Sequence, residues 1–200
     1  MRVKALMLTT ALAAALAVSA CQKTGAADNK AATADVSPAA ASATPPPPAA
    51  TPAPDATTAQ GFVTAAATSD MYEIAAAKLA QQKSKTPAVE TFAAKMIHDH
   101  GESTAALKKL LTGVGVNATA PAAMDDRHNG MINDLNQAPA SGFDKAYMDQ
   151  QVAAHTEAAA LFQGYVSGGD NDSLKKFAAK VLPTIQSHLA MAKQMDGSMQ

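Results

Sequence analysis

The 200-residue chain has no tryptophan, a single cysteine and only 4% aromatic residues. A β-sandwich core draws on valine, isoleucine and aromatic side chains. Here alanine supplies much of the 48% hydrophobic fraction, which favours helices packed through small residues. One cysteine cannot form a disulfide within a monomer. The formal net charge of −1 provides no basic surface for DNA or RNA, so we expect no nucleic-acid partner.

Motifs that carry catalytic chemistry are also missing from the sequence. It contains neither a Gly-x-Ser-x-Gly nucleophile motif nor a glycine-rich loop for phosphate. A di-iron carboxylate site needs Glu-x-x-His pairs on two helices. In this chain alanine stands three residues after each of Glu73, Glu90, Glu102 and Glu157. We therefore expect a protein that is not an enzyme.

The long apolar run of the sequence is at the N-terminus. Arg2 and Lys4 precede an uncharged stretch over residues 5–18, which is too short for a comfortable membrane-spanning helix. Val18-Ser19-Ala20-Cys21 then resembles a bacterial lipobox. The pattern predicts a signal peptide over residues 1–20 and lipidation of Cys21. Gln22 in place of aspartate favours outer-membrane sorting, so we expect a periplasmic-side protein that is attached to the membrane through its lipid.

Residues 21–57 are rich in proline, alanine and threonine and include the run Pro45-Pro46-Pro47-Pro48. Such a composition supplies almost no large apolar side chain that a core requires. We interpret this segment as a disordered tether. The folded domain is expected to span residues 58–197.

Apolar side chains at alternating three- and four-residue spacing predict four long helices in this domain. Their approximate ranges are 59–83, 87–113, 143–166 and 172–195, with a shorter helix near 125–136. The connection that holds the short helix is long enough to cross a bundle. The sequence therefore predicts an all-α, ferritin-like four-helix bundle with an extra helix in the connection between the second and third long helices.

The start of the third long helix is marked by a recognisable capping motif. Ser141-Gly142-Phe143-Asp144 resembles a capping box in which aspartate replaces glutamate. We therefore expect the Asp144 carboxylate to accept hydrogen bonds from free N–H groups in the first turn of this helix.

Each long helix carries one titratable residue near the middle of its apolar stripe, namely Glu73, His100, His155 and His188. The midpoints of bundled helices meet at one level whether neighbours run parallel or antiparallel. A buried polar group without a partner is unfavourable, so these four side chains should meet one another. The spacing predicts a single polar layer across the bundle.

A combination of residues along the domain is shared with a known family: Phe62, Glu73, Phe92-Ala93, Met96, Asp99-His100, Phe143-Asp144, Tyr147, His155, Leu174, Phe177-Ala178, Leu182-Pro183 and His188-Leu189. Through these positions, residues 60–195 resemble an exported, ferritin-like domain of unknown function that occurs in many Gram-negative bacteria. Members of that family are usually described only as outer-membrane or exported proteins. The resemblance implies the helical fold and does not imply an activity.

Two hypotheses account for the polar layer. In the first, His100, His155, His188 and Glu73 bind one zinc, copper or iron ion, with Asp99 and Tyr147 as candidates for orienting the ligands. In the second, the same residues form a hydrogen-bonded network that fixes helix pairing. The protein then has a structural, stress-related or envelope-interaction role with a protein partner that the sequence does not identify.

Overall fold

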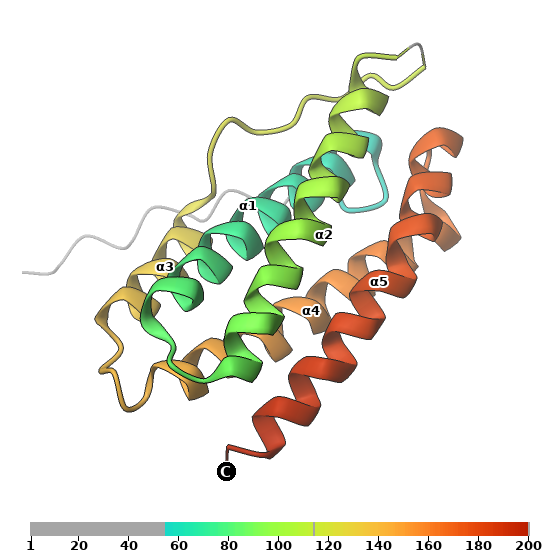
Figure 1. The fold of residues 1–200 in the computed structure, drawn as a ribbon. Coiled ribbons are helices and arrows are strands. Elements are labelled where there is room, and N and C mark those ends of the chain that lie inside the picture. Colours follow the sequence, from blue (N-terminus) through green and yellow to red (C-terminus); the bar gives the residue numbers. More distant parts are fainter. Residues whose placement is uncertain (1–54, 114, 200) are drawn as a thin grey trace, which may run out of the picture. The chain divides into compact units, whose positions relative to one another are not determined.

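The structure, a computed structural model, describes residues 55–113 and 115–199. In this part of the chain all regular secondary structure is helical. Its helices are α1 (Ala59–Lys83), α2 (Pro87–Leu111), α3 (Asp126–Gln137), α4 (Phe143–Gly168) and α5 (Asp172–Gly197) (Figure 1). The predicted four-helix bundle with a short extra helix is confirmed, and the predicted ends agree to within about two residues. The predicted signal peptide, Cys21 and the predicted tether up to residue 54 lie outside the described residues.

The long helices form two antiparallel hairpins, α1–α2 and α4–α5, which pack against each other (Figure 1). Phe62, near the start of α1, stacks on Tyr165, near the end of α4, so α1 and α4 are also antiparallel. Thr86, just before α2, donates a hydrogen bond to Asp144 in the first turn of α4, so these two helices begin at the same end. Residues 112–142 must therefore return along the bundle, and α3 lies in this return.

Side-chain caps explain where three of the helices begin. The side chain of Thr58 accepts a hydrogen bond from the backbone N–H of Gly61 at the start of α1. Asp125 caps α3 in the same way, and Asn171 accepts from two backbone N–H groups of α5. These oxygens satisfy donors that have no partner within the helix, and each such cap typically stabilises a protein by about 1 kcal/mol.

The expectation that Asp144 caps its own helix is wrong. The capping position of α4 is held by Gly142, and no side chain forms a cap hydrogen bond there. Asp144 Oδ2 instead accepts a hydrogen bond from Thr86 Oγ1 at 2.6 Å. This carboxylate therefore joins the start of α4 to the α1–α2 connection.

The bundle has two apolar clusters, one toward each end. The aromatic cluster contains Phe62, Phe162, Tyr165 and Phe177. The other, which we call the methionine cluster, includes Met96 and Met148 together with Tyr72, Phe92, Ala93, Phe143 and Tyr147. Between the clusters all four long helices bury polar side chains: Asp70, Glu73, His100, Gln151, His155 and His188.

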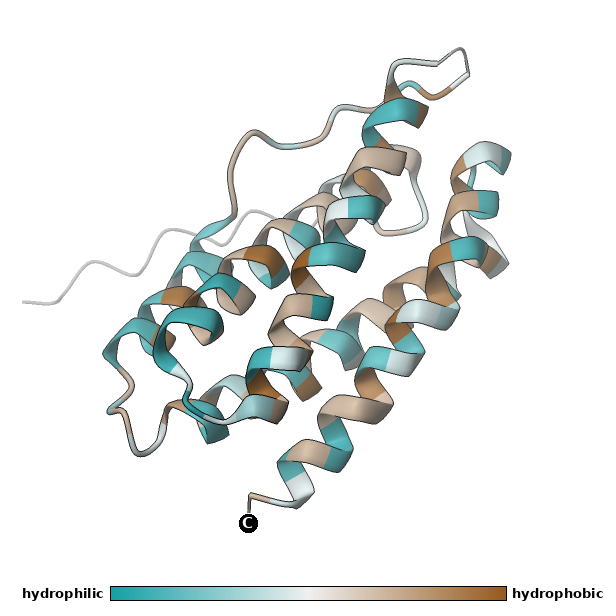
Figure 2. Cartoon of the chain, viewed as in Figure 1, coloured by the Kyte–Doolittle hydropathy of each residue, from teal (hydrophilic) through white to brown (hydrophobic). Residues whose placement is uncertain are grey.

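Hydropathy differs between the long helices and α3. The long helices alternate apolar and polar residues along their length, whereas α3 is largely hydrophilic (Figure 2). One side chain of α3, Leu135, is buried. Lys83 holds the end of α3 by donating to the backbone carbonyls of Leu135 and Asn136 at 2.8 and 2.7 Å. In the described part of the chain, each helix is too short or too polar to cross a lipid bilayer.

Candidate metal centre

Three histidines from three helices meet in the middle of the bundle. His100 lies on α2, His155 on α4 and His188 on α5, and each is at most 5% exposed. The ring centroids are 5.3 to 5.5 Å apart. One nitrogen of each ring lies within 4.8 Å of the corresponding nitrogens of the other two. The spacing of the apolar stripes is enough to place these rings at one level, as the sequence predicts.

His100 is held by α1. Its Nδ1 lies 2.8 Å from Asp70 Oδ1, and both side chains are buried. The second carboxylate oxygen of Asp70 accepts a hydrogen bond from Thr104 Oγ1 at 3.2 Å. The other ring nitrogen of His100, Nε2, is buried and has no hydrogen-bond partner among the described residues.

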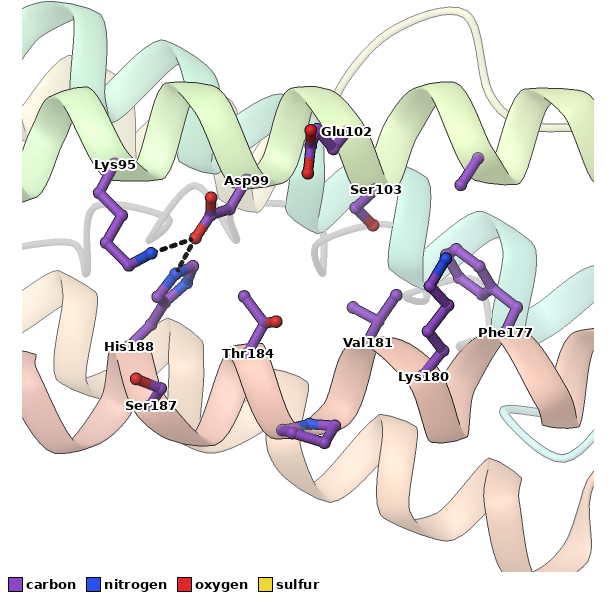
Figure 3. A pocket seen from close by; sticks show the side chains of 12 residues that line it. Lys95, Asp99, Glu102, Ser103, Phe177, Lys180, Val181, Thr184, Ser187 and His188 are labelled. Atoms are coloured by element: carbon purple, nitrogen blue, oxygen red, sulfur yellow. Dashed lines mark hydrogen bonds and ion pairs between the residues drawn. The ribbon is translucent and has the colours of Figure 1, made fainter.

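His188 is held by α2. Its Nε2 lies 2.8 Å from Asp99 Oδ2, which also accepts a hydrogen bond from Lys95 at 2.8 Å (Figure 3). Its Nδ1 faces the Nε2 of His155 at 3.3 Å. One nitrogen of His188 is thus directed at a carboxylate and the other at a second imidazole.

His155 is held within its own helix and by α1. Its Nδ1 lies 3.0 Å from the backbone carbonyl oxygen of Gln151 and 3.4 Å from Glu73 Oε1. The side-chain amide of Gln151 donates to Glu73 Oε2 at 2.6 Å. Glu73 therefore lies against the same side of the His155 ring as the carbonyl.

These contacts determine which nitrogen of each ring carries a proton. Carboxylate and carbonyl oxygens only accept hydrogen bonds, so His100 Nδ1, His155 Nδ1 and His188 Nε2 each carry a proton. In the neutral rings of His155 and His188 the other nitrogens carry lone pairs, and these two nitrogens face each other. Two lone pairs 3.3 Å apart repel unless a cation lies between them. The donor set is therefore suited to a positive ion.

The pKa values of His155 and His188 fit neutral rings, whereas that of His100 favours the charged form. Burial lowers the pKa of His155 to about 3 and that of His188 to about 4, so both rings are neutral at neutral pH. Burial acts on His100 in the same direction. However, the hydrogen bond to Asp70 and the charge of Glu73 outweigh it and raise the pKa of His100 above its usual value.

Two carboxyl groups near the histidines behave differently. Burial raises the pKa of Glu73 to about 7, although the positive charge of His100 and the hydrogen bond from Gln151 oppose this shift. Burial also acts to raise the pKa of Asp99. Hydrogen bonds from Lys95, His98 and His188 outweigh it and hold the pKa of Asp99 well below its usual range. Asp99 is thus a permanent negative charge beside His188.

The structure brings Glu73, Asp99, His100, His155 and His188 together, and their roles toward a metal stay a prediction. Glu73 was placed among the ligands, but its carboxylate lies on the N–H side of His155, away from the nitrogens that converge. Asp99 lies against a neighbouring histidine, which is the role suggested for it. Tyr147 packs on Phe143 and Phe92 with ring centroids 6.2 and 6.3 Å away, about two helical turns before His155.

Two residues of the site were missed as site residues by reasoning from sequence. Asp70 holds His100, and Gln151 supplies both the carbonyl for His155 and the amide for Glu73. Asp70 follows Phe62 and Ala66 on the apolar stripe of residues 59–83. An aspartate on such a stripe needs a buried partner, and this was the available signal. Gln151 has no comparable signal, because a glutamine on a helix is usually solvated.

Comparisons with known proteins identify the family and support the fold. A family model described as a domain of unknown function, DUF4142, matches residues 43–195, and the chain belongs to this family. The structure is similar to that of CopM in its Cu(II)-bound form, with a TM-score of 0.61 and 19% identity, over 72% of this chain and 98% of that one. CopM in its Cu(I)-bound form gives a TM-score of 0.58 at 19% identity, over 71% and 97% of the two chains.

A third solved structure, a DUF305 fragment from Deinococcus radiodurans, gives a TM-score of 0.60 at 12% identity, over 68% of this chain and 93% of that one. At these identities the three likenesses establish a shared helical fold. No curated protein matches the chain.

Proposed function

We propose that this protein binds one transition-metal ion between His100, His155 and His188, and that copper is the ion it binds best. The observation that carries the proposal is that one ring nitrogen of each histidine is already paired with an oxygen. Each histidine has one nitrogen engaged by an oxygen acceptor, from Asp70, Asp99 or the Gln151 carbonyl, which leaves its other nitrogen free for an ion in the common centre. Metal-binding histidines in proteins are oriented in this way.

The distances in the site support the same proposal. Two nitrogens that each lie about 2.0 to 2.1 Å from a tetrahedral ion are about 3.3 to 3.4 Å apart. His155 Nε2 and His188 Nδ1 are 3.3 Å apart. His100 completes the triad within 4.8 Å, and its Nε2 has no other partner among the described residues. An ion would draw His100 inward and satisfy this buried nitrogen.

The choice of copper rests on ligand chemistry. Neutral imidazole suits zinc, copper, iron and nickel, and for a given set of nitrogen ligands the affinity is highest for Cu²⁺ among the divalent ions of the first transition row. The likeness to CopM, a protein solved in Cu(II)- and Cu(I)-bound forms, supports copper as the first ion to test.

Metal analysis of the full chain, purified without chelator and then loaded with copper, zinc and iron in turn, tests the proposal. We expect about one ion per chain, with copper retained most strongly. A His188→Gln variant should lose the ion and keep its helical circular dichroism. His128→Ala removes a histidine outside the triad and should bind metal as the parent does. A parent protein that takes up no metal under any of these conditions contradicts the proposal.

A second candidate function is structural, with the polar layer fixing helix pairing in a protein that interacts with other components of the envelope. The Gln151–Glu73 and His188–Asp99 hydrogen bonds favour it, because they join α4 to α1 and α5 to α2 without an ion. Thermal unfolding with and without copper separates the two functions. Binding to the folded state raises the melting temperature, whereas a purely structural layer leaves it unchanged.

We also propose that the protein is held at the periplasmic side of the membrane by a lipid on Cys21. The support is the lipobox-like sequence Val18-Ser19-Ala20-Cys21. Metabolic labelling with a radioactive fatty acid should label the parent and not a Cys21→Ser variant. Fractionation should find the parent in the membrane pellet. A soluble, unlabelled parent contradicts this proposal.

A further inference from the structure

The two helices that carry Asp99 and His188 are separated by a groove. Among neighbouring long helices, α2 and α5 are the pair that packs least closely. Between them lies a cavity of about 470 Å³ whose lining includes Asp99, Ser103, Thr184, Ser187 and His188 (Figure 3). Four other cavities in the described part of the chain are lined by none of the three triad histidines. This groove therefore reaches the candidate centre from solvent.

Metal-binding side chains lead through this groove in a connected series. Beside the groove and outside its lining, His98 Nε2 lies 3.7 Å from Glu102 Oε1, and His98 Nδ1 lies 2.8 Å from Asp99 Oδ1. Asp99 Oδ2 lies 2.8 Å from His188 Nε2. His188 Nδ1 then faces His155 at 3.3 Å. Imidazole and carboxylate groups thus form every step from the surface to the triad.

Exposure falls steadily along this series. The side chains of Glu102 and His98 are 74% and 68% exposed, that of Asp99 is 15% exposed, and that of His188 is 1% exposed. The first two are accessible to an ion that is still hydrated, while Asp99 stands at the boundary between solvent and core. The order of exposure is the order in which an ion from solution would lose its water.

A further side chain indicates that the groove holds a polar ligand. Ser103 lines the groove, is 8% exposed, and its Oγ has no hydrogen-bond partner among the described residues. Figure 3 shows this hydroxyl directed into the space between α2 and α5. A buried hydroxyl is normally hydrogen-bonded, and an ion with its remaining water molecules in the groove would supply the partner.

We propose that the α2–α5 groove is the entry and exit route of the metal, and that His98, Glu102 and Asp99 form a transient binding site on this route. The inference rests on the proposed metal-binding function. A transient rotation of the His188 ring lets the ion pass from the Asp99 carboxylate to the free lone pairs of His188 Nδ1 and His155 Nε2. The ring then returns with its Nε2 proton bonded to Asp99, so no proton is released.

The backbone of α5 is suited to this rotation. Pro183 lies inside α5, five residues before His188, and lines the groove. Proline lacks the N–H that would donate to the carbonyl four residues earlier, so the helix lacks one backbone hydrogen bond at this point. The carbonyl left free is that of Ala179, so α5 is less constrained beside the groove than an uninterrupted helix.

The test fills the groove without substituting any residue of the triad or of the transient site. Thr184→Trp places a large side chain in the groove, and Gln186→Trp places the same side chain on an exposed position of α5 outside the groove lining. Uptake of Cu²⁺ by the full chain, and its removal by a chelating dye, are followed by the absorbance of the dye. We expect Thr184→Trp to slow both rates by about tenfold or more at unchanged stoichiometry, which corresponds to about 1.4 kcal/mol in the barrier. Gln186→Trp should exchange at the rate of the parent.

Two further variants provide a second way to fill the groove and a separate test of the transient site. If Thr184→Trp does not fold, Ser187→Trp fills the same groove from an exposed position. A His98→Ala, Glu102→Ala double variant should load more slowly at low copper concentration and reach the same final stoichiometry. Metal exchange at the parental rate in both groove-filling variants, or in the double variant, overturns the inference alone. A parent that binds no metal overturns the proposed function, and the inference with it.

Discussion

The aromatic cluster and the polar layer are built in the same way, but they differ in whether every buried atom has an interaction partner. All four long helices contribute to each of them, and both are buried. In the aromatic cluster the ring of Phe62 lies 5.1, 4.1 and 6.4 Å from those of Phe162, Tyr165 and Phe177, measured between centroids. The Phe62 ring therefore packs against three other rings. In the polar layer one buried nitrogen of His100 has no partner in the part of the chain that the structure describes.

This difference indicates a division of tasks within one bundle. Apolar and aromatic contacts are non-directional and stabilise the fold without any ligand. A buried polar network is stabilising only when each of its members is paired. The aromatic cluster is therefore expected to determine stability, and the polar layer to determine ligand binding.

Removing Phe62 is expected to have the largest effect on stability. Phe62→Ala leaves a cavity between three aromatic rings, and such a change typically destabilises a protein by about 3 to 5 kcal/mol. Urea unfolding monitored by circular dichroism measures the loss. At a temperature where the variant is folded, its copper stoichiometry should equal that of the parent. A loss of copper from the folded variant would show that the two regions are not separable.

The pH dependence of the metal-free protein should come from the polar layer. His155 and His188 have lowered pKa values in the folded state, so the unfolded chain takes up more protons below about pH 6.5 and stability falls as the pH falls toward 4. Glu73 and His100 have raised pKa values, so they stabilise the folded state at low pH and lose this contribution as the pH rises, which for Glu73 happens through about pH 7. We therefore expect a stability maximum near pH 6.5, where the two opposite effects meet.

Urea midpoints of the chelator-treated protein, measured between about pH 4 and 9, give this profile. The two histidines outweigh Glu73 on the acid side, where the net uptake on unfolding is about one proton. His155→Gln should flatten the acid limb and leave the alkaline limb in place. A midpoint that is independent of pH would show that the layer titrates identically in the folded and unfolded chain.

Replacing Asp99 sharpens the comparison, because in the triad site this residue acts on the ion through His188, whose Nε2 it holds. Asp99→Asn keeps the shape of the side chain and weakens its hold on His188 Nε2. Loss of such an orienting partner typically reduces metal affinity by about 10- to 100-fold. Competition with a chelating dye measures the affinity. Asp149→Asn, which removes an exposed carboxylate of α4 paired with Lys145, is the matched control and should bind copper as the parent does.

The smallest effect is expected at the surface. Arg127 and Glu157 form an ion pair at 2.6 Å, with side chains 51% and 59% exposed. Pairs of this kind contribute about 0 to 1 kcal/mol because solvent and salt screen them. Arg127→Ala should therefore shift the urea midpoint only slightly and leave copper binding unchanged. A large loss of stability would mean that α3 is more important to the bundle than its single buried side chain suggests.

Much of the fold was predictable because helical periodicity is a local property. The stripes of apolar residues placed the four long helices and the short helix to within about two residues of their observed ends. The error at Asp144 has a physical cause. A capping box can be recognised from spacing, but Thr86, which lies 58 residues earlier, binds this carboxylate in the folded chain.

The sequence by itself determined the level at which the three histidines meet. A rise of about 1.5 Å per residue sets the height of a residue in its helix, and about 3.6 residues per turn set the face on which it lies. Only the tertiary structure decided how these rings are oriented. The pairing of His100 with Asp70, 30 residues away, and of His188 with Asp99, 89 residues away, depends on how the helices are rotated and spaced against one another. The orientation of the three inner nitrogens, and with it the proposed metal site, follows from that packing.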